Sequence, residues 1–289
     1  MHYLNADLHC HSTFSDGSLP PEVLAQRAAE RGVELWALTD HDDISGISAA
    51  RAACQALGMS FITGVEVSIT FAGETVHILG FGFDEHHPDL VAGLAHVRSG
   101  RLARARAMSD SLAQVGIKGA YEAACALAPN PELVSRTHFG RFLVEQGHCA
   151  DMGEVFRRYL KPGKPGYVPH QWAGLGEALR WLHGAGGVTA IAHPARYPFN
   201  PTVEYALFSE FQGHGGQGVE VVCGSHTGAD VERVSGLALE FGLLATRGSD
   251  FHSPTESRVD LGELPPLPGR LTPIWTLWPA LAQAAARAQ

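Results

Sequence analysis

The sequence lacks the features of a secreted, disulfide-rich or membrane-spanning protein. Its 289 residues include five scattered cysteines and no Cys-x-x-Cys pair, which is typical of reduced thiols rather than of disulfides or a thiolate zinc site. No run of about 18 apolar residues is present to span a bilayer. No basic segment opens the chain as it would in an export signal. We therefore expect a cytoplasmic protein.

The chain also lacks an excess of positive charge. Its net charge of −9 argues against a protein that coats nucleic acid. The charge is uneven, because residues 98–164 contain 11 of the 21 Lys and Arg but only 6 of the 30 Asp and Glu. The rest of the chain therefore carries the negative charge. A basic segment inside an acidic chain indicates where an anionic substrate binds.

Apolar, β-rich runs alternate with Ala- and Leu-rich helical runs, which predicts an α/β fold. No internal repeat is found, and no Gly-x-Gly-x-x-Gly follows a strand, so dinucleotide binding has little support. The expected strands are residues 3–9, 34–39, 60–66, 75–80, 187–192, 218–222 and 243–248. The expected helices between them are residues 21–31, 45–57, 174–185 and 229–241, each closed by a glycine suited to a helix C-terminus.

More than a hundred residues separate the fourth and fifth expected strands, far more than a crossover needs. Most of this length is predicted to be helical, over residues 88–115, 136–146 and 151–160. We therefore predict a basic helical cap, residues 99–166, inserted into a barrel domain formed by residues 1–98 and 167–289. Residues 282–289 are expected to form a helical or frayed tail.

Metal-ligand residue types gather near the ends of the expected strands. Because loops at one rim of an α/β barrel build the active site, these side chains are expected to share one pocket. Within Asp7-Leu8-His9-Cys10-His11 the alternation of a strand points both imidazoles to one face. The candidate residues are His9, His11, Asp40, His41, Glu66, His77, His193, Asp250 and His252.

Each motif also has a structural interpretation. Asp16 in Ser-Asp-Gly suits an ordinary turn, and one aspartate of the Thr-Asp-His-Asp-Asp segment is expected to cap the following helix. We assign metal binding to His41 and orientation of its ring to Asp40. Glu66 interrupts an apolar strand, where a carboxylate costs free energy unless an ion or hydrogen bonds compensate it. His77 is either a ligand or a hydrogen-bonded core histidine.

Taken together, the motifs resemble the PHP (polymerase and histidinol phosphatase) family: an early His-x-His, a later Asp, Thr-Asp-His, a strand Glu, a strand His and a late Asp-x-His. The resemblance implies up to three ions and nine ligands. These match His9, His11, Asp16, His41, Glu66, His77, His138, Asp250 and His252. It implies that His9, His11, Glu66 and Asp250 hold one ion, that Glu66, His77 and His138 hold a second, and that Asp16, His41 and His252 hold a third.

The resemblance further implies a distorted (β/α)7 barrel and is strongest to the branch of stand-alone nucleotide phosphatases and exonucleases. Members of this branch act on 3′,5′-bisphosphonucleotides or RNA 5′ ends. We expect a phosphatase for the 3′-phosphate of such bisphosphates. Imidazole and carboxylate ligands favour Mn²⁺, with Fe²⁺ or Zn²⁺ as alternatives.

Outside the nine ligands, His193 is expected to contact the phosphoryl group, to protonate the leaving oxygen or to be structural. Cationic and hydroxyl groups of the cap are the candidates for binding the nucleotide, and solvated surface charge is the competing interpretation. These candidates are Arg101, Arg104, Ser135, Arg136 and Lys164.

Three alternatives remain open. One is a phosphatase for histidinol phosphate or another sugar phosphate. Another is an amidohydrolase, since such barrels also open with His-x-His and close with a strand-end Asp. The last is a non-catalytic metal-binding module. We expect no membrane or duplex DNA partner, because a short basic cap suits a small anion or a strand end better than a long duplex.

Overall fold

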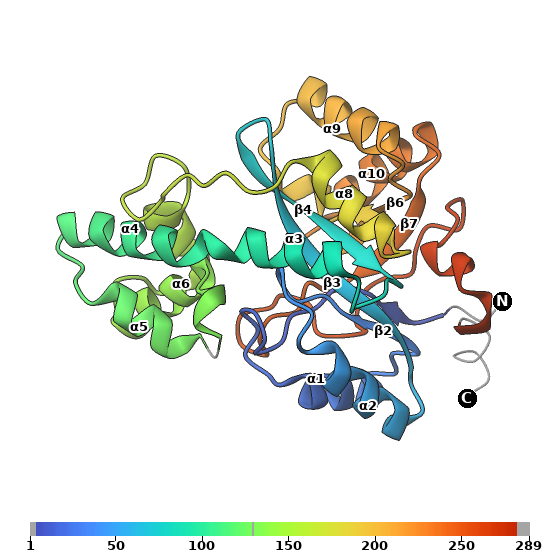
Figure 1. Cartoon of the computed structure of the whole chain (residues 1–289), viewed down its shortest axis with the longest axis horizontal. Coiled ribbons are helices and arrows are strands. Elements are labelled where there is room, and N and C mark those ends of the chain that lie inside the picture. Colours follow the sequence, from blue (N-terminus) through green and yellow to red (C-terminus); the bar gives the residue numbers. More distant parts are fainter. Residues whose placement is uncertain (1–3, 129, 282–289) are drawn as a thin grey trace.

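The computed structural model describes residues 4–128 and 130–281, in which seven strands form one sheet in chain order (Figure 1). Their bounds are β1 (Ala6–Asp7), β2 (Leu35–Leu38), β3 (Ser60–Phe71), β4 (Glu74–Phe81), β5 (Val188–Ile191), β6 (Gly218–Cys223) and β7 (Leu244–Gly248). All seven expected strands are present, although β1 is shorter and β3 longer than predicted. The expected helical or frayed tail, residues 282–289, lies outside the described residues.

One strand is reversed in this otherwise parallel sheet. β4 runs antiparallel to both neighbours, pairing Glu66 with Leu79 and Ile78 with Ile191, whereas the other neighbours pair in parallel. A tight turn at Ala72 and Gly73 joins β3 to β4 with no helix between them. Because β4 is reversed, its first half lies at the rim where the parallel strands end, and His77 is brought there.

The first and last strands close the barrel. Leu8 N donates to Arg247 O at 3.0 Å, and Asp250 N donates to His9 O at 2.8 Å. Gly248 permits this close approach, because an added Cβ would overlap the Cβ of His9 and lie 2.6 Å from its backbone nitrogen. The contact between the first and last strands thereby places His9 beside Asp250.

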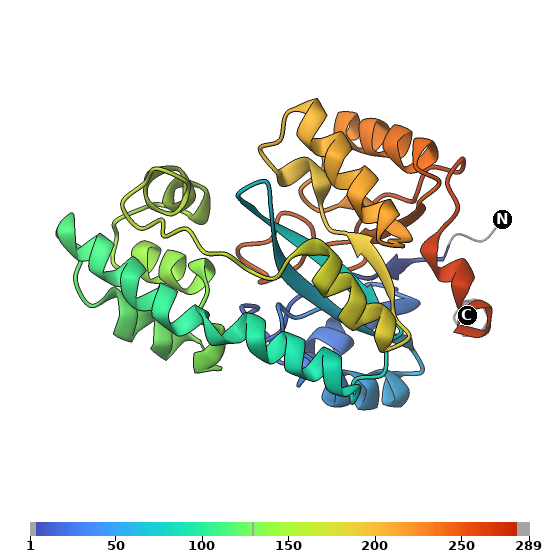
Figure 2. The same ribbon diagram turned by 45° about the horizontal axis from the view of Figure 1, so that its top comes forward.

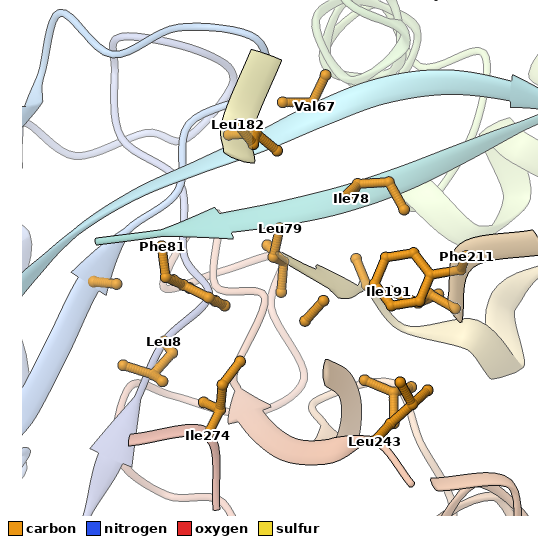
Figure 3. Packing of buried hydrophobic residues seen from close by; sticks show 14 of the residues in the cluster. Leu8, Val67, Ile78, Leu79, Phe81, Leu182, Ile191, Phe211, Leu243 and Ile274 are labelled. Carbon is orange, nitrogen blue, oxygen red and sulfur yellow. The ribbon is translucent and has the colours of Figure 1, made fainter. Parts of the chain in front are cut away.

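Helices pack on the outside of the barrel, and apolar side chains fill the space between them and the strands. In Figure 3, Leu8, Phe81 and Ile274 converge, and Ile191 lies beside Phe211; all five are fully buried. The covering helices are α1 (Pro21–Glu30), α2 (Ile47–Leu57), α3 (Pro88–Ser99), α8 (Leu175–Gly184), α9 (Pro201–Gly213) and α10 (Gly228–Glu240). Helix α9 is an addition to the predicted set.

The segment between β4 and β5 forms a helical lobe to one side of the barrel (Figures 1 and 2). It contains α4 (Arg101–Gln114), α5 (Ala120–Leu127), α6 (Arg136–Glu145), α7 (Met152–Val155) and a π-helical turn, Phe156–Leu160. The lobe has its own apolar cluster, including Met108, Leu112 and Phe139. The single helix expected over 88–115 is divided at Gly100 into α3 and α4. No helix within 4–128 or 130–281 is long and apolar enough to cross a membrane.

Candidate metal centre

Four side chains from three parts of the chain meet at the rim of the barrel. His9 Nε2 lies 3.3 Å from Glu66 Oε1 and 3.5 Å from Asp250 Oδ1. His11 Nε2 lies 3.4 Å from Glu66 Oε2 and 3.2 Å from Asp250 Oδ1. Both imidazoles and Glu66 are fully buried. The structure therefore brings together the first expected ligand group, His9, His11, Glu66 and Asp250.

A second group, on the side of the cap, is formed by Asp16, His41 and His252. Asp16 Oδ1 lies 3.3 Å from His252 Nε2 and 3.7 Å from His41 Nε2. His11 contributes its other nitrogen, Nδ1, at 4.0 Å from Asp16 Oδ1. Donor atoms of these four residues all lie within 4.8 Å of one another, as a shared ion requires.

The third expected group differs from the structure in one member. His77 Nδ1 and His193 Nε2 each lie 2.9 Å from Glu66 Oε1. His138 is not brought to Glu66: it lies in the first turn of α6, where its Nδ1 accepts a hydrogen bond from Ser135 N at 3.1 Å. His193 thus lies beside Glu66 together with His77. His138 keeps a buried Nε2 without a hydrogen bond, as His11 and His77 do at Nδ1, and its role as a ligand stays a prediction.

The backbone is strained at this rim. Asp42, His193 and Asp250 have φ angles of 52°, 27° and 55°, in the left-handed region that non-glycine residues rarely adopt. Such conformations cost about 1–3 kcal/mol each and persist where surrounding contacts hold them. Their concentration at one rim marks it as a functional site.

The electrostatics prepare the cluster for cations. Burial lowers the pKa of His11 and of His193 to about 3, so both rings are neutral and keep a lone pair for an ion. Burial opposes ionisation of Glu66, but His77 and His41 hold its pKa well below the usual range. Burial likewise lowers the pKa of His252, yet the Asp16 carboxylate raises it to about 9, so without an ion this ring carries a proton that a bound ion would displace. The carboxylates are thus ionised at neutral pH.

The donor set fits a transition-metal centre. Buried atoms without a hydrogen bond include His11 Nδ1, Asp16 Oδ1, His41 Nδ1, Glu66 Oε2 and His77 Nδ1. His41 Nδ1 lies only 2.8 Å from Glu66 Oε2 without hydrogen-bond geometry. Unpaired buried polar atoms are costly, and donor atoms gathered in groups within 4.8 Å of one another would be compensated by bound cations. Mixed imidazole and carboxylate donors suit Mn²⁺, Fe²⁺ or Zn²⁺.

Glu220 is a site residue that the sequence analysis missed. Fully buried in β6, it accepts from His9 Nδ1 at 3.0 Å and from His193 N at 2.8 Å. It therefore fixes the ring of His9 with Nε2 facing Glu66 and Asp250. The available signal was a carboxylate in the apolar run Gly-Val-Glu-Val-Val, the same signal that identified Glu66.

We expect Glu220→Gln to weaken Mn²⁺ binding about 10- to 100-fold, because partners of this kind set the basicity and orientation of a ligand histidine. Titration of the metal-free protein with Mn²⁺ measures the effect. Glu210→Gln, an exposed change on α9, is the control. An unchanged affinity in Glu220→Gln would contradict the assigned role.

Asp40 does not contact the ring of His41 as expected. Its buried carboxylate accepts from Ser12 N at 2.7 Å, from Ser12 Oγ at 2.6 Å and from Ser15 Oγ at 2.5 Å. Burial nevertheless raises the pKa of Asp40 to about 6. Asp40 thus shapes the loop between His11 and Asp16 rather than the ring beside it.

An arginine-rich cavity of about 100 Å³ opens onto the cluster. Among the described residues, no carboxylate forms an ion pair with Arg104 or Arg136, although both line this cavity. Burial lowers the pKa of Arg104 to about 9 and also lowers that of Arg136. Arg101 lines the cavity too, but its guanidinium pairs with Asp42 and lies 3.2 Å from Ser68 Oγ. Arg104 and Arg136 therefore carry charge that is available to bind an anion.

The remaining predicted binding residues separate. Ser135 lines the cavity and donates to Asp16 Oδ2 at 3.0 Å, whereas Lys164 is exposed and does not line it. The lining also includes Trp172, Phe156 and Arg196, which the sequence analysis did not identify. Arg196 pairs with Asp250. It follows the strand-end residue His193 by three positions, and this closeness in the sequence could have identified it as a site residue.

A barrel rim with clustered metal ligands beside a cationic cavity defines a metal-dependent phosphoesterase. The PHP domain family matches residues 7–163, more than half of the chain. The chain belongs to the PHP family.

Two relatives extend over nearly the whole chain. A protein of Chromobacterium violaceum described as a 3′,5′-nucleoside bisphosphate phosphatase is 49% identical over 94% of this chain and 95% of its own length. A protein of Haemophilus influenzae described as a 5′-3′ exoribonuclease is 40% identical over 93% and 97%.

Solved structures agree on the fold. One, described as an amidohydrolase from Chromobacterium violaceum with bound sulfate and no metal, is 49% identical, with a TM-score of 0.93 over 96% of both chains. Another, described as a putative metal-dependent phosphoesterase from Bifidobacterium adolescentis, is 26% identical, with a TM-score of 0.79 over 96% of both. The expected α/β barrel of PHP type is confirmed.

Proposed function

We propose that the protein hydrolyses the 3′-phosphate of a nucleoside 3′,5′-bisphosphate, and that the same centre accepts a 5′-phosphorylated RNA end. The observation that carries this proposal is the pair Arg104 and Arg136, one buried and one half-buried arginine without acidic partners among the described residues, in the cavity that the ligand cluster lines. A simple monoester needs only the anion site at the metal centre. A bisphosphate occupies that site and also the one formed by Arg104 and Arg136. The description of the Chromobacterium violaceum relative supports this substrate.

Three ligand groups, with Glu66 shared by the first two, would hold the ions; we favour Mn²⁺. The proposed groups are His9, His11, Glu66 and Asp250, then Glu66 with the two histidines 2.9 Å from its Oε1, His77 and His193, and finally Asp16, His41 and His252, whose donor atoms lie within 4.8 Å of one another. Bound ions supply an activated water and neutralise the phosphoryl oxygens. This assignment makes His193 a ligand rather than a proton donor. His138, the third residue of α6, holds the Ser135 backbone through Nδ1 and keeps its buried Nε2 free of hydrogen bonds, so it stays a candidate ligand.

The protein's own groups position the substrate. Arg104 and Arg136 bind the second phosphate by charge-assisted hydrogen bonds, which fixes the first phosphate against the cluster. Arg104 Nε donates to Val168 O at 3.2 Å, so its guanidinium is held in place before substrate arrives. Ser135 Oγ donates to Asp16, and Arg101 pairs with Asp42. These two residues therefore position other side chains of the site rather than bind the substrate.

We further propose that residues 99–166 are an inserted subdomain that closes over the barrel and supplies these cations. The separate apolar cluster of the lobe supports this division. We also propose a cytoplasmic location, which the five free thiols support, since such thiols are typical of a reducing compartment.

A substrate panel tests the function. With the Mn²⁺-loaded protein, we expect kcat/KM for adenosine 3′,5′-bisphosphate to exceed that for the 3′-monophosphate, the 5′-monophosphate and histidinol phosphate by at least about tenfold, the value of one charge-assisted contact. Phosphate release measures each. If histidinol phosphate is the best substrate, the cationic cavity has been misassigned, and if an amide is cleaved instead, the reaction class is wrong.

A further inference from the structure

A second, larger cavity adjoins the metal centre. Its volume is about 440 Å³, against about 100 Å³ for the inner cavity. The two cavities have five lining residues in common, so they meet at the cluster. The shared residues are Thr137, Phe156, Arg196, Asp250 and His252. Nucleotide-sized ligands occupy pockets of about 300–1,000 Å³, so a second nucleotide of a strand has no room in the inner cavity.

The lining of the outer cavity suits a nucleoside. Phe156 and Met152 offer an aromatic ring and a thioether, whereas Ser225 and Ser257 offer hydroxyls. Stacking of bases on aromatic side chains is worth about 1–3 kcal/mol and tolerates any base. This combination fits a sugar and base without selecting a sequence.

The charges of the outer cavity leave one cation free. Glu256 is neutralised by Arg141, with Nε and Nη2 each 2.8 Å from its oxygens, and Asp250 is paired with Arg196. Arg258 is exposed on this lining, and no hydrogen bond or ion pair joins its guanidinium to another described residue. A free guanidinium beside an aromatic pocket is the pattern that single-stranded nucleic acid requires.

We propose that the outer cavity binds the nucleotide downstream of the scissile phosphate of an RNA strand, and that Arg258 contacts the next phosphate. This inference rests on the proposed function. With the 5′-phosphate on Arg104 and Arg136, the phosphate following the first nucleoside lies at the cluster and the strand leaves through the outer cavity.

The same bond breaks in both substrates. Water adds to phosphorus, the bond from phosphorus to the 3′-oxygen of the first nucleoside breaks, and that oxygen takes up a proton. From a bisphosphate the product is inorganic phosphate. From RNA the phosphate stays on the downstream strand as a new 5′-phosphate, which can enter the arginine-lined cavity for the next cycle.

The test compares kcat/KM for adenosine 3′,5′-bisphosphate and for a 5′-phosphorylated RNA trinucleotide. We expect Arg258→Ala to lower the ratio of the RNA value to the bisphosphate value about tenfold. The salt dependence of log kcat/KM for RNA should also become shallower by about 0.7, as expected for one lost phosphate contact. Arg180→Ala, an exposed arginine of α8 that lines neither cavity, is the matched control and should leave both values unchanged.

The outcomes separate the two proposals. If the wild type hydrolyses the bisphosphate but not RNA, or if Arg258→Ala leaves the ratio and salt slope unchanged, the outer cavity does not bind a strand. If Arg258→Ala lowers kcat/KM equally for both substrates, the single nucleoside of the bisphosphate itself occupies the outer cavity. That outcome also overturns the inference. If the wild type hydrolyses neither substrate, the proposed function itself is wrong.

Discussion

Replacing Glu66 by glutamine is expected to lower kcat by about a thousandfold and to reduce the bound Mn²⁺ by about one ion per chain. Glu66 lies within 3.4 Å of ring nitrogens of His9, His11, His41, His77 and His193. It is the carboxylate that joins the first two ligand groups. Glutamine keeps the size but removes the charge, so the histidines lose the anion around which they are arranged.

Metal content by mass spectrometry and phosphate release under saturating substrate measure these two effects. Glu240→Gln, an exposed change at the end of α10, controls for loss of a carboxylate elsewhere. Thermal unfolding of the metal-free variants distinguishes a misfolded protein from a folded one with a defective centre. A Glu66→Gln protein that keeps both wild-type metal content and wild-type rate would contradict the assigned centre.

The second large effect is expected from Arg104→Ala, which should lower kcat/KM for the bisphosphate about 10- to 100-fold and change the value for a simple aryl phosphate less than about threefold. A hydrogen bond to a charged group is worth about 1.5–3 kcal/mol, and about 1.4 kcal/mol corresponds to a factor of ten. Arg104 is buried and has no carboxylate partner among the described residues, so its charge is available to the second phosphate.

Arg106 provides a matched comparison on the same helix. It lies two residues from Arg104 in α4 but is exposed and stacks on Tyr121 at 4.5 Å from the ring centroid. Arg106→Ala should therefore leave both substrates unaffected, whereas Arg136→Ala should behave like Arg104→Ala. If Arg104→Ala lowers kcat/KM equally for the bisphosphate and the aryl phosphate, Arg104 contacts the reacting phosphate or supports the fold of the site instead.

Local sequence patterns predicted which candidate ligands on strands, or directly after them, the fold would bring together. The alternation in His9-Cys10-His11 gives two imidazoles on one face whatever the rest of the fold does. Glu66 could be identified because a carboxylate in an apolar strand needs compensation. Asp250 and His252 follow an apolar strand directly, and the barrel brings all strand ends of this kind to one rim.

The pairing of distant segments was not predictable in this way. The reversal of β4 follows from the short hairpin with β3, and it leaves His77 at the rim although His77 is not at the end of its strand. The sequence placed His193 outside the ligand set, and only the fold shows that its Nε2 lies 2.9 Å from Glu66 whereas His138 Nδ1 accepts from Ser135 N. Glu220 acts on His9 across 211 positions of the chain.

Charge patterning located the cationic region but did not show which of its side chains are placed to bind the substrate. Arg101, Arg104 and Lys164 carry the same formal charge in the sequence. In the structure, Arg101 is neutralised by Asp42, Arg104 is buried without a partner and Lys164 is exposed. Distinguishing them requires burial and partners, which depend on how the lobe packs against the barrel.

The most direct test of the central claim is titration of chelator-treated protein with Mn²⁺ while phosphate release from adenosine 3′,5′-bisphosphate is followed. We predict no release by the metal-free protein and a return of activity that saturates at two or three ions per chain, as the three ligand groups require. Undiminished release by protein shown to be free of metal would contradict the account.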